Sequence, residues 1–216
     1  MAVLDEVAPE QRVDAPSSVV TLSTMEFRVL GPLTVAAGAR RVTPGSERRR
    51  TILAVLLAAG GEPVSTGRLL EAVWGSPPPS GSKTLRSHVS RLRGELSAGD
   101  ARGSEAVVTE RDGYRVDRSV GDLDADRFEA LLARARAAKD DDPAAAVPFF
   151  EEAERLWRGP AFGELAACEI VRFEAVRLER LRAAATDERI EARLTLGHDG
   201  PRGGRAPPRV GLGTVP

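Results

Sequence analysis

The chain has 216 residues and a formal net charge of −1, with 31 Lys and Arg against 32 Asp and Glu. This length gives room for one large domain or two small ones and allows a substantial core. A single cysteine, Cys168, excludes an internal disulfide and a cysteine-rich zinc site. The sequence contains no apolar run of about 18 residues, and its acidic N-terminus lacks the pattern of a secretory signal. We therefore expect a cytoplasmic protein without a membrane span.

The near-neutral total hides two regions of opposite charge. Residues 40–118 carry 14 Lys and Arg against 9 Asp and Glu, whereas residues 119–200 carry 12 against 18. This segregation predicts two modules, a basic one suited to an anionic partner and an acidic one.

The first ordered elements are predicted to be strands. Residues 1–23 are polar and show no sustained period, which predicts a disordered extension. From Met25 onward apolar residues alternate around the turn Gly31-Pro32, and a second turn follows near Gly38. The resulting small sheet needs helices to cover it.

Two helices are predicted next. Ser46 can cap a helix in ERRRTILAVLLAAG, whose apolar residues lie almost all round, so this helix should be buried. Ser65 or Thr66 can cap a short amphipathic helix in VSTGRLLEAVWG, which Gly75 ends.

The segment KTLRSHVSRLR, from Lys83 to Arg93, is the most informative part of the chain. It has four basic residues and no acidic ones, and Ser82 is expected to cap it. A helical spacing predicts one core face, made of Leu85, Val89, Leu92 and Leu96. The opposite face then carries cations and short hydroxyls: Lys83, Thr84, Arg86, Ser87, Ser90, Arg91 and Arg93. Such a face suits DNA phosphates and the guanine edge, although a charge-rich helix is also compatible with an ordinary solvated surface.

The basic module is predicted to end in a hairpin. SAGDARGSEA reads as a polar turn, and AVVTERDGYRVD predicts two strands around Arg111, Asp112 and Gly113. A small sheet, three helices and a β-hairpin wing are the parts of a winged helix-turn-helix, which is an α+β fold.

The acidic module is predicted to be all-α. Two helices are predicted to form an antiparallel pair, one in LDADRFEALLARARAAK and one in AAAVPFFEEAERLW. After Gly159-Pro160 a long helix follows over about 169–196. Its apolar stripe consists of Leu178, Leu181, Ala185, Ala192 and Leu196. Helix pairs of this length are typical of tetratricopeptide-like folds, and the Gly/Pro-rich tail should be disordered.

Several segments resemble the antibiotic regulatory protein (SARP) family of actinobacterial activators. Its OmpR/PhoB-type DNA-binding domain is similar, in chain order, to MEFRVLGPLTV, RRRTILAVLLAAGG, VSTGRLLEAVWG, TLRSHVSRLRGEL and DGYRV. Its bacterial transcriptional activation domain is similar to DLDADRFEALLARAR, ERLWRGPAF and VRLERLRAAATDERIEARLTLG. The resemblance covers about residues 25–198. It divides the chain into an extension, a winged-helix domain, a partial activation domain and a disordered tail, at residues 1–23, 24–118, 119–198 and 199–216.

The resemblance also implies a set of DNA contacts. The third helix enters the major groove, where Arg91 and Thr84 would read bases. Phosphate neighbours on this helix would be Lys83, His88, Ser90 and Arg93, and Arg86 and Ser87 complete the set. In the preceding helix Trp74 would give its indole N–H to a phosphate. In the wing, Arg111 would enter the minor groove and Tyr114 would reach a phosphate.

Alternatives stay open at several of these positions. Trp74 is equally compatible with core packing, and His88 with a surface histidine that has no metal partner. Ser90 is shorter than the basic residue that some relatives place there. The wing has Arg111 and Asp112 where the family often has prolines, and Asp112 would repel phosphate.

From the resemblance we expect a transcriptional activator of a secondary-metabolite (antibiotic) gene cluster, bound as a homodimer to promoter direct repeats and recruiting RNA polymerase holoenzyme. We expect no enzyme activity, cofactor or metal. The rival, a nucleotide hydrolase, fails because Ser82 separates Gly81 from Lys83, unlike a Walker loop. A true start at Met25 is compatible with the sequence. We expect about half of the activation domain to be absent and no phosphoacceptor domain ahead of the winged helix. A DNA-binding competitor or interaction module without activation is therefore the alternative.

Overall fold

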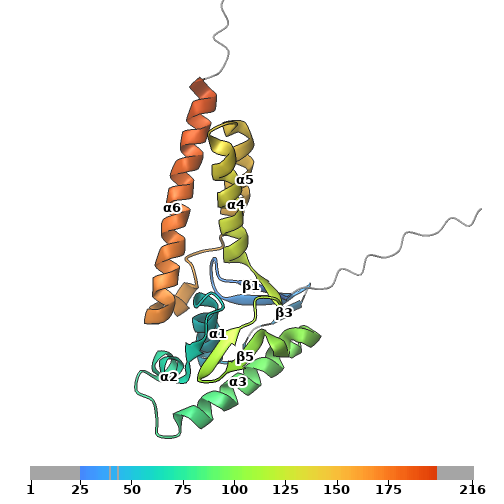
Figure 1. The fold of residues 1–216 in the computed structure, drawn as a ribbon, viewed down its shortest axis with the longest axis vertical. Helices are drawn as coiled ribbons and strands as arrows, with labels where there is room; N and C mark the ends of the chain where they lie inside the picture. The colour runs from blue at the N-terminus through green and yellow to red at the C-terminus, as the bar shows by residue number, and fades with distance from the viewer. Residues whose placement is uncertain (1–24, 39, 43, 199–216) are drawn as a thin grey trace, which may run out of the picture.

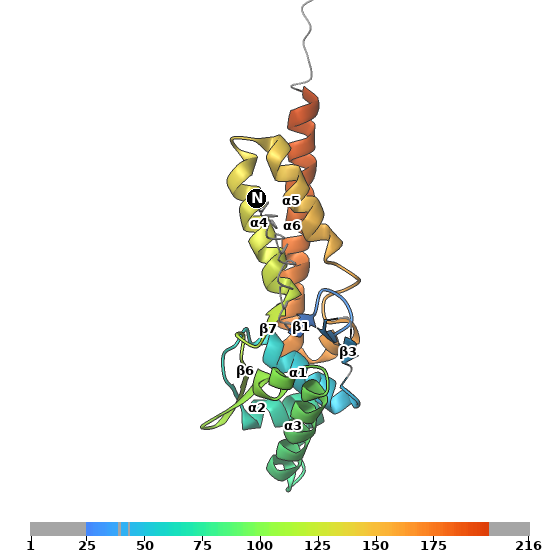
Figure 2. The ribbon, with the colours of Figure 1, turned by 90° about the vertical axis from the view of Figure 1, so that its right-hand side faces the viewer.

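The computed structural model describes residues 25–38, 40–42 and 44–198, so the predicted N-terminal extension and C-terminal tail lie outside the described residues. Two modules are visible in Figures 1 and 2, a mixed α/β part at one end and a set of long helices at the other. This is the predicted architecture, an α+β winged helix-turn-helix followed by an all-α, tetratricopeptide-like part.

The N-terminal sheet has four strands in the order β3-β2-β1-β7. Strands β1 (Met25–Arg28), β2 (Thr34–Ala37) and β3 (Arg40–Val42) are antiparallel neighbours. The last strand, β7 (Gly121–Leu123), lies parallel to β1. The sequence predicted the first strands, but not β7. This strand follows the boundary expected at residue 118, and yet it completes the sheet of the first module.

Two helices cover the sheets as predicted. Helix α1 (Glu47–Ala58) starts at Ser46, whose Oγ accepts a hydrogen bond from the Arg49 N–H, and its residues 52–57 are buried. Helix α2 (Thr66–Trp74) is capped in the same way by Ser65, and Gly75 ends it with a φ of 66°.

Helix α3 (Gly81–Ser97) begins before the predicted cap. Ser82 lies inside the helix, and the N-cap is Ser80, whose side chain makes no capping hydrogen bond. The reason is the turn at residues 78–81, where the Gly81 N–H donates to the Pro78 carbonyl at 2.8 Å. Gly81 is buried so close to Leu70 that a Cβ would lie 3.1 Å from its methyl group. A glycine here lets the helix start two residues earlier than a cap at Ser82 would allow.

The wing belongs to a second sheet, with the order β4-β6-β5. Strands β5 (Val107–Glu110) and β6 (Gly113–Val116) form the predicted hairpin, and β4 (Val64–Ser65) pairs with β6.

The segment before the hairpin corrects another expectation, because the expected polar turn is the 3₁₀ helix η1 (Ala101–Ala106). It packs on α3, and Gly103 and Ala106 are buried. A Cβ at Gly103 would lie 2.3 Å from the Leu96 carbonyl oxygen, so only glycine allows this contact.

The C-terminal part is built of helices α4 (Asp124–Lys139), α5 (Pro143–Arg155) and α6 (Glu169–His198), with the short η2 (Gly163–Ala167) before α6. The first two form the predicted antiparallel pair, and α6 lies along them (Figures 1 and 2). The ring of Phe128 meets Trp157 edge-on at 5.3 Å in their core. Of the predicted stripe on α6, Leu178, Ala185 and Ala192 are buried and Leu181 is half-buried, but Leu196 is 38% exposed. The stripe ends there because the α4–α5 pair no longer covers the helix. None of the described helices is long and apolar enough to cross a bilayer.

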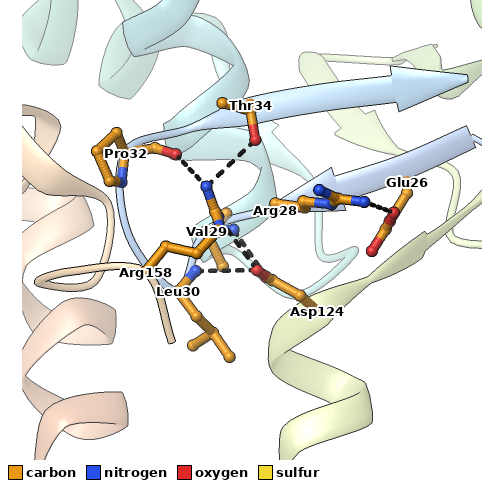
Figure 3. Close-up of polar contacts among 8 residues, drawn as sticks. All are labelled: Glu26, Arg28, Val29, Leu30, Pro32, Thr34, Asp124 and Arg158. Carbon is orange, nitrogen blue, oxygen red and sulfur yellow. Dashed lines mark hydrogen bonds and ion pairs between the residues drawn. The ribbon is translucent and has the colours of Figure 1, made fainter. Parts of the chain in front are cut away.

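A backbone junction joins the two modules at Val29 and Leu30, directly after β1. Their N–H groups donate to the Asp124 carboxylate at 2.7 and 3.2 Å. Their carbonyls accept from Phe162 and Arg158 N–H, each at 2.7 Å. Residues of the helical part therefore satisfy all four of these backbone groups, as Figure 3 shows for the carboxylate side.

Candidate nucleic-acid interface

Helix α3 has the two faces that the sequence predicts. Its core residues Leu85, Val89, Leu92 and Leu96 are at most 1% exposed and pack against α1, α2 and η1. The opposite side is exposed at five of the expected contact residues, which are Lys83, Arg86, Ser87, Ser90 and Arg91. The apolar stripe fixes the rotation of the helix, and this rotation brings the cations together on the outer surface.

Two hydroxyls on this face, those of Thr84 and Ser87, already have hydrogen-bond partners at the start of the helix. Thr84, half-buried in the first turn, donates its Oγ1–H to the Ser80 carbonyl at 3.2 Å, and Ser87 donates to the Lys83 carbonyl at 3.2 Å. Each oxygen keeps lone pairs that can accept a hydrogen bond from a base amino group, whereas its own proton is engaged.

Arg93 corrects the expectation that its side chain points freely outward. It is half-buried, and its Nε donates to the Val107 carbonyl while Nη2 donates to Thr109 Oγ1, both at 2.8 Å. The planar guanidinium spans two acceptors on β5. Arg93 therefore ties the end of α3 to the wing.

Trp74 and His88 form one cluster at the contact of α2 with α3. Their rings meet edge-on with centroids 5.7 Å apart, and the Arg48 guanidinium lies 5.5 Å from the indole centroid. Trp74 is half-buried, so it packs against His88 as well as lining the surface. Arg48 is exposed and was missed by sequence reasoning. The sequence feature that could have indicated Arg48 is the run ERRR at the start of α1, which places cations beside the end of α2.

His88 lies in a strongly cationic environment. Burial, followed by the charges of Arg49, Arg48 and Arg91, lowers the pKa of its imidazole below the ordinary value of 6.5. Its Nδ1 is buried and has no hydrogen-bond partner among the described residues. The ring is therefore neutral near pH 7 in the free protein, and an anion at this position would reverse the shift.

The wing contributes less than expected. Arg111 and Asp112 are exposed at its tip, and the Asp112 carbonyl accepts the Thr66 N–H at 2.8 Å, which fixes the tip to the start of α2. Tyr114, expected to reach a phosphate, is 7% exposed and packs in the core. It faces inward because the strands alternate and the β6 position opposite Val64 belongs to the buried face.

The outer surface of α3 carries uncompensated positive charge. Lys83, Arg86 and Arg91 form no ion pair within the part of the chain that the structure describes. Glu95, the acidic residue of α3, pairs with Arg49 at 2.9 Å. No group of His, Cys, Asp and Glu residues suited to a metal occurs among the described residues. This surface is therefore suited to bind a polyanion through long cations and short hydroxyls.

The fold and this face define the class of the protein, a winged-helix domain joined to a helical domain. Two family models match these parts separately. The model described as "Transcriptional regulatory protein, C terminal" matches residues 40–116, and the "Bacterial transcriptional activator domain" matches residues 123–202. Together with the relatives below, this order of domains shows that the chain belongs to the SARP family, which consists of transcriptional regulators and not of enzymes.

Individual relatives agree with this assignment. The regulatory protein AfsR of Streptomyces griseus is 34% identical over 193 residues, which cover 88% of this chain and 19% of AfsR. The transcriptional regulatory protein MoaR1 of Mycobacterium tuberculosis is 31% identical over 67% of this chain and 48% of its own length. A structure of Mycobacterium tuberculosis EmbR in complex with a low-affinity phosphopeptide superposes with a TM-score of 0.72 at 27% identity, covering 81% of this chain and 46% of EmbR. The chain thus spans about half or less of these relatives.

Proposed function

We propose that this protein is a sequence-specific DNA-binding transcriptional regulator that inserts α3 into the major groove. The observation that carries the proposal is the division of α3 into a fully buried apolar stripe and an exposed basic face without internal ion pairs. An α-helix fits the width of the major groove, and a cationic surface lowers the free energy of binding by releasing counterions.

Within this proposal the contact residues have separate tasks. Arg91 reads a guanine edge through its two parallel N–H donors, and Thr84 accepts from a base at the start of the helix. On α3, phosphate contacts come from the remaining exposed residues, Lys83, Arg86, Ser87 and Ser90. His88, Trp74 and Arg48, which lie beside them, also contact phosphates. Arg111 at the wing tip reaches toward the minor groove. Arg93 contributes to DNA binding indirectly, because it holds the wing against α3.

The helical part has the opposite role in this proposal. Its acidic surface is repelled by DNA and is left for a protein partner, the RNA polymerase holoenzyme. Two protomers bind as a homodimer on promoter direct repeats in the cytoplasm, and the family suggests a secondary-metabolite (antibiotic) gene cluster as the target. The alternative is a competitor, which occupies the same repeats without activating transcription.

The test of the DNA role is a footprint on DNA upstream of the neighbouring genes, followed by binding titrations. We expect Arg91→Ala to lose about 1 to 3 kcal/mol of binding free energy and to flatten the preference between the footprinted site and scrambled DNA. Affinity should fall with salt by about one power of concentration for each neutralised phosphate. The control is Arg172→Ala, an exposed arginine on α6 that should leave binding unchanged. Equal affinity of wild type and Arg91→Ala for the footprinted site would sink the base-reading role.

A transcription assay separates the activator from the competitor. Both should protect the same repeats, so protection alone does not distinguish them. Transcript from a promoter carrying the repeats should rise with added protein for an activator and stay flat or fall for a competitor.

A further inference from the structure

Helix α3 has one acidic residue, Glu95, which contacts the start of α1. The Arg49 Nε donates to Glu95 Oε2, and Arg49 Nη2 lies beside Glu95 Oε1, both at 2.9 Å. The guanidinium therefore meets the carboxylate through two parallel contacts, which is the strongest arrangement of such a pair. The pair is largely enclosed, with side-chain exposures of 13% for Arg49 and 28% for Glu95.

The same carboxylate also holds the backbone that leads into α1. The Gly45 N–H donates to Glu95 Oε1 at 3.2 Å. A Cβ at Gly45 would lie 3.0 Å from both Arg49 Nη2 and Glu95 Oε1, so a larger residue would displace the pair. The next residue, Ser46, caps α1 by accepting the Arg49 N–H. Glu95 thus fixes the first turn of α1 against the neighbouring α3 (Figure 2).

This first turn places two adjacent arginines in different surroundings. Arg48 is exposed, and its guanidinium lies 5.5 Å from the centroid of the Trp74 indole, whose ring meets His88. Arg49 is half-buried and paired with Glu95. Its charge still acts on the same cluster, because burial and then the charge of Arg49 contribute most to the lowered pKa of His88. Arg48 is therefore available to a phosphate, whereas Arg49 is neutralised close to the contact face.

We propose that Glu95 is a positioning residue that determines DNA specificity, because it neutralises Arg49 and holds the turn that carries Arg48. The proposal rests on the DNA-binding role of α3. Non-specific binding depends on the number of cations near the phosphates, whereas recognition of a site also needs contact residues in fixed positions. Neutralising Arg49 weakens binding to every sequence, and fixing Arg48 favours the recognised one. Both effects increase the ratio of specific to non-specific affinity.

The first experiment is a binding titration of Glu95→Gln with the footprinted site and with scrambled DNA of equal length. Glutamine keeps one acceptor oxygen for the start of α1 but leaves the charge of Arg49 uncompensated. Affinity for scrambled DNA should rise about fivefold at about 50 mM salt, and its logarithmic slope against salt should steepen by about 0.9, the value for one added phosphate contact. Affinity for the footprinted site should stay within about twofold, because the looser turn offsets the added charge. The preference for the site should therefore fall.

A second variant separates charge from structure. Glu95→Gln/Arg49→Gln removes both charges, and the two amides can still form a hydrogen bond. Affinity for scrambled DNA and the salt slope should return to the wild-type values, and most of the preference should recover. A purely structural role predicts the opposite order, because the double variant has the weaker contact between α1 and α3. Urea denaturation checks that both variants are folded.

Glu105→Gln is the matched control, since it removes the same charge from the same module. Glu105 pairs with Arg102 on η1 at 3.3 Å, and both side chains are 61% exposed. Solvent and salt screen an exposed pair, so both DNA affinities should stay within about twofold of wild type.

Three outcomes would overturn the role of Glu95 alone. They are an unchanged preference in Glu95→Gln, a double variant no closer to wild type than the single one, and equal gains in non-specific affinity for Glu95→Gln and Glu105→Gln. A wild type that does not distinguish the footprinted site from scrambled DNA would overturn the base-reading role of α3 together with this proposal.

Discussion

The carboxylate of Asp124 accepts a 2.7 Å hydrogen bond from the backbone N–H of Val29, although 95 residues separate them in sequence. Asp124 is the first residue of α4 and is 5% exposed, and its other oxygen accepts from Leu30 N–H and from Arg158. The start of α4 and the segment after α5 thus hold the residues that follow β1 (Figure 3). This relationship fixes the orientation of the DNA-facing module relative to the helical module.

Removal of this carboxylate should destabilise the whole chain. Asp124→Ala leaves two buried N–H donors and one face of the Arg158 guanidinium without acceptors, and we expect a loss of about 3 kcal/mol in the free energy of unfolding. Asp124→Asn keeps one acceptor oxygen and should lose about half as much. Urea denaturation followed by circular dichroism measures both values.

Asp122 provides the matched control for this prediction. It lies two residues earlier on β7 and is exposed, so Asp122→Ala should change the free energy of unfolding by less than about 0.5 kcal/mol. Equal losses for Asp122→Ala and Asp124→Ala would mean that the junction does not depend on the buried carboxylate.

The same carboxylate should give stability a recognisable pH dependence. Burial raises the pKa of Asp124 above its ordinary 3.8, and the hydrogen bonds from Val29 and Leu30 and the charge of Arg158 offset this only in part. The folded state therefore holds the proton more tightly than the unfolded state, and stability from this group grows as pH falls through the raised pKa, then levels off below 3.8. The free energy of unfolding of wild type minus that of Asp124→Asn should increase from pH 7 to pH 4. A difference that shrinks toward acid would show a depressed pKa instead.

Local patterns in the sequence predicted most of the elements, because caps and helical periods act over a few residues. Ser46 and Ser65 cap the helices as expected, and the stripe from Leu85 to Leu96 gave the rotation of α3. The strand β7 was missed because its pairing with β1 is long-range and its three residues carry no period of their own. The junction at Asp124 was missed for the same reason.

The orientation of a contact residue was predictable from the sequence only where its side chain has no binding partner that is distant in sequence. Arg91 extends into solvent as expected, whereas Arg93 finds acceptors on β5 that are distant in sequence. Tyr114 is drawn inward by its place in the strand alternation, and Arg48 reaches the face only because α1 begins beside Trp74. The contacts of Arg93 with β5 leave no local signal in the sequence.

Arg93 should prove to be a structural support of the wing. Arg93→Ala removes two hydrogen bonds to β5, and we expect a loss of about 1 to 2 kcal/mol in the free energy of unfolding. Amide hydrogen exchange of residues 107–110 should become faster, because the hairpin loses its tie to α3. Its neighbour Arg91 is exposed, so Arg91→Ala should stay within about 0.5 kcal/mol of wild type.

Arg93→Lys distinguishes geometry from charge. Lysine keeps the positive charge but cannot span the Val107 carbonyl and the Thr109 hydroxyl as a planar fork does. Arg93→Ala should weaken binding to all DNA sequences alike, because the wing loses its tie to α3. Arg93→Lys should therefore stay close to Arg93→Ala in both DNA affinity and hairpin protection. Full recovery of DNA affinity by Arg93→Lys would show that this residue acts as a phosphate contact.

His88 should report directly on phosphate contact through its titration. In the free protein, burial and the charges of Arg49, Arg48 and Arg91 hold its pKa below 6.5. The unfolded chain therefore takes up the proton first as pH falls through 6.5, and the stability that His88 contributes is present above that value and declines toward the lower folded pKa. A DNA phosphate beside the ring favours the imidazolium, so the pKa should rise in the complex.

Proton NMR of the histidine ring can measure both states. The chain has two histidines, so His88→Gln assigns the signal and His198 serves as the internal reference. Because binding takes up a proton, wild-type DNA affinity should rise from pH 8 to pH 6 by about two- to tenfold more than that of His88→Gln. An unchanged His88 pKa in a saturated complex, with parallel affinity profiles, would place the phosphate away from this ring and leave His88 to its contact with Trp74.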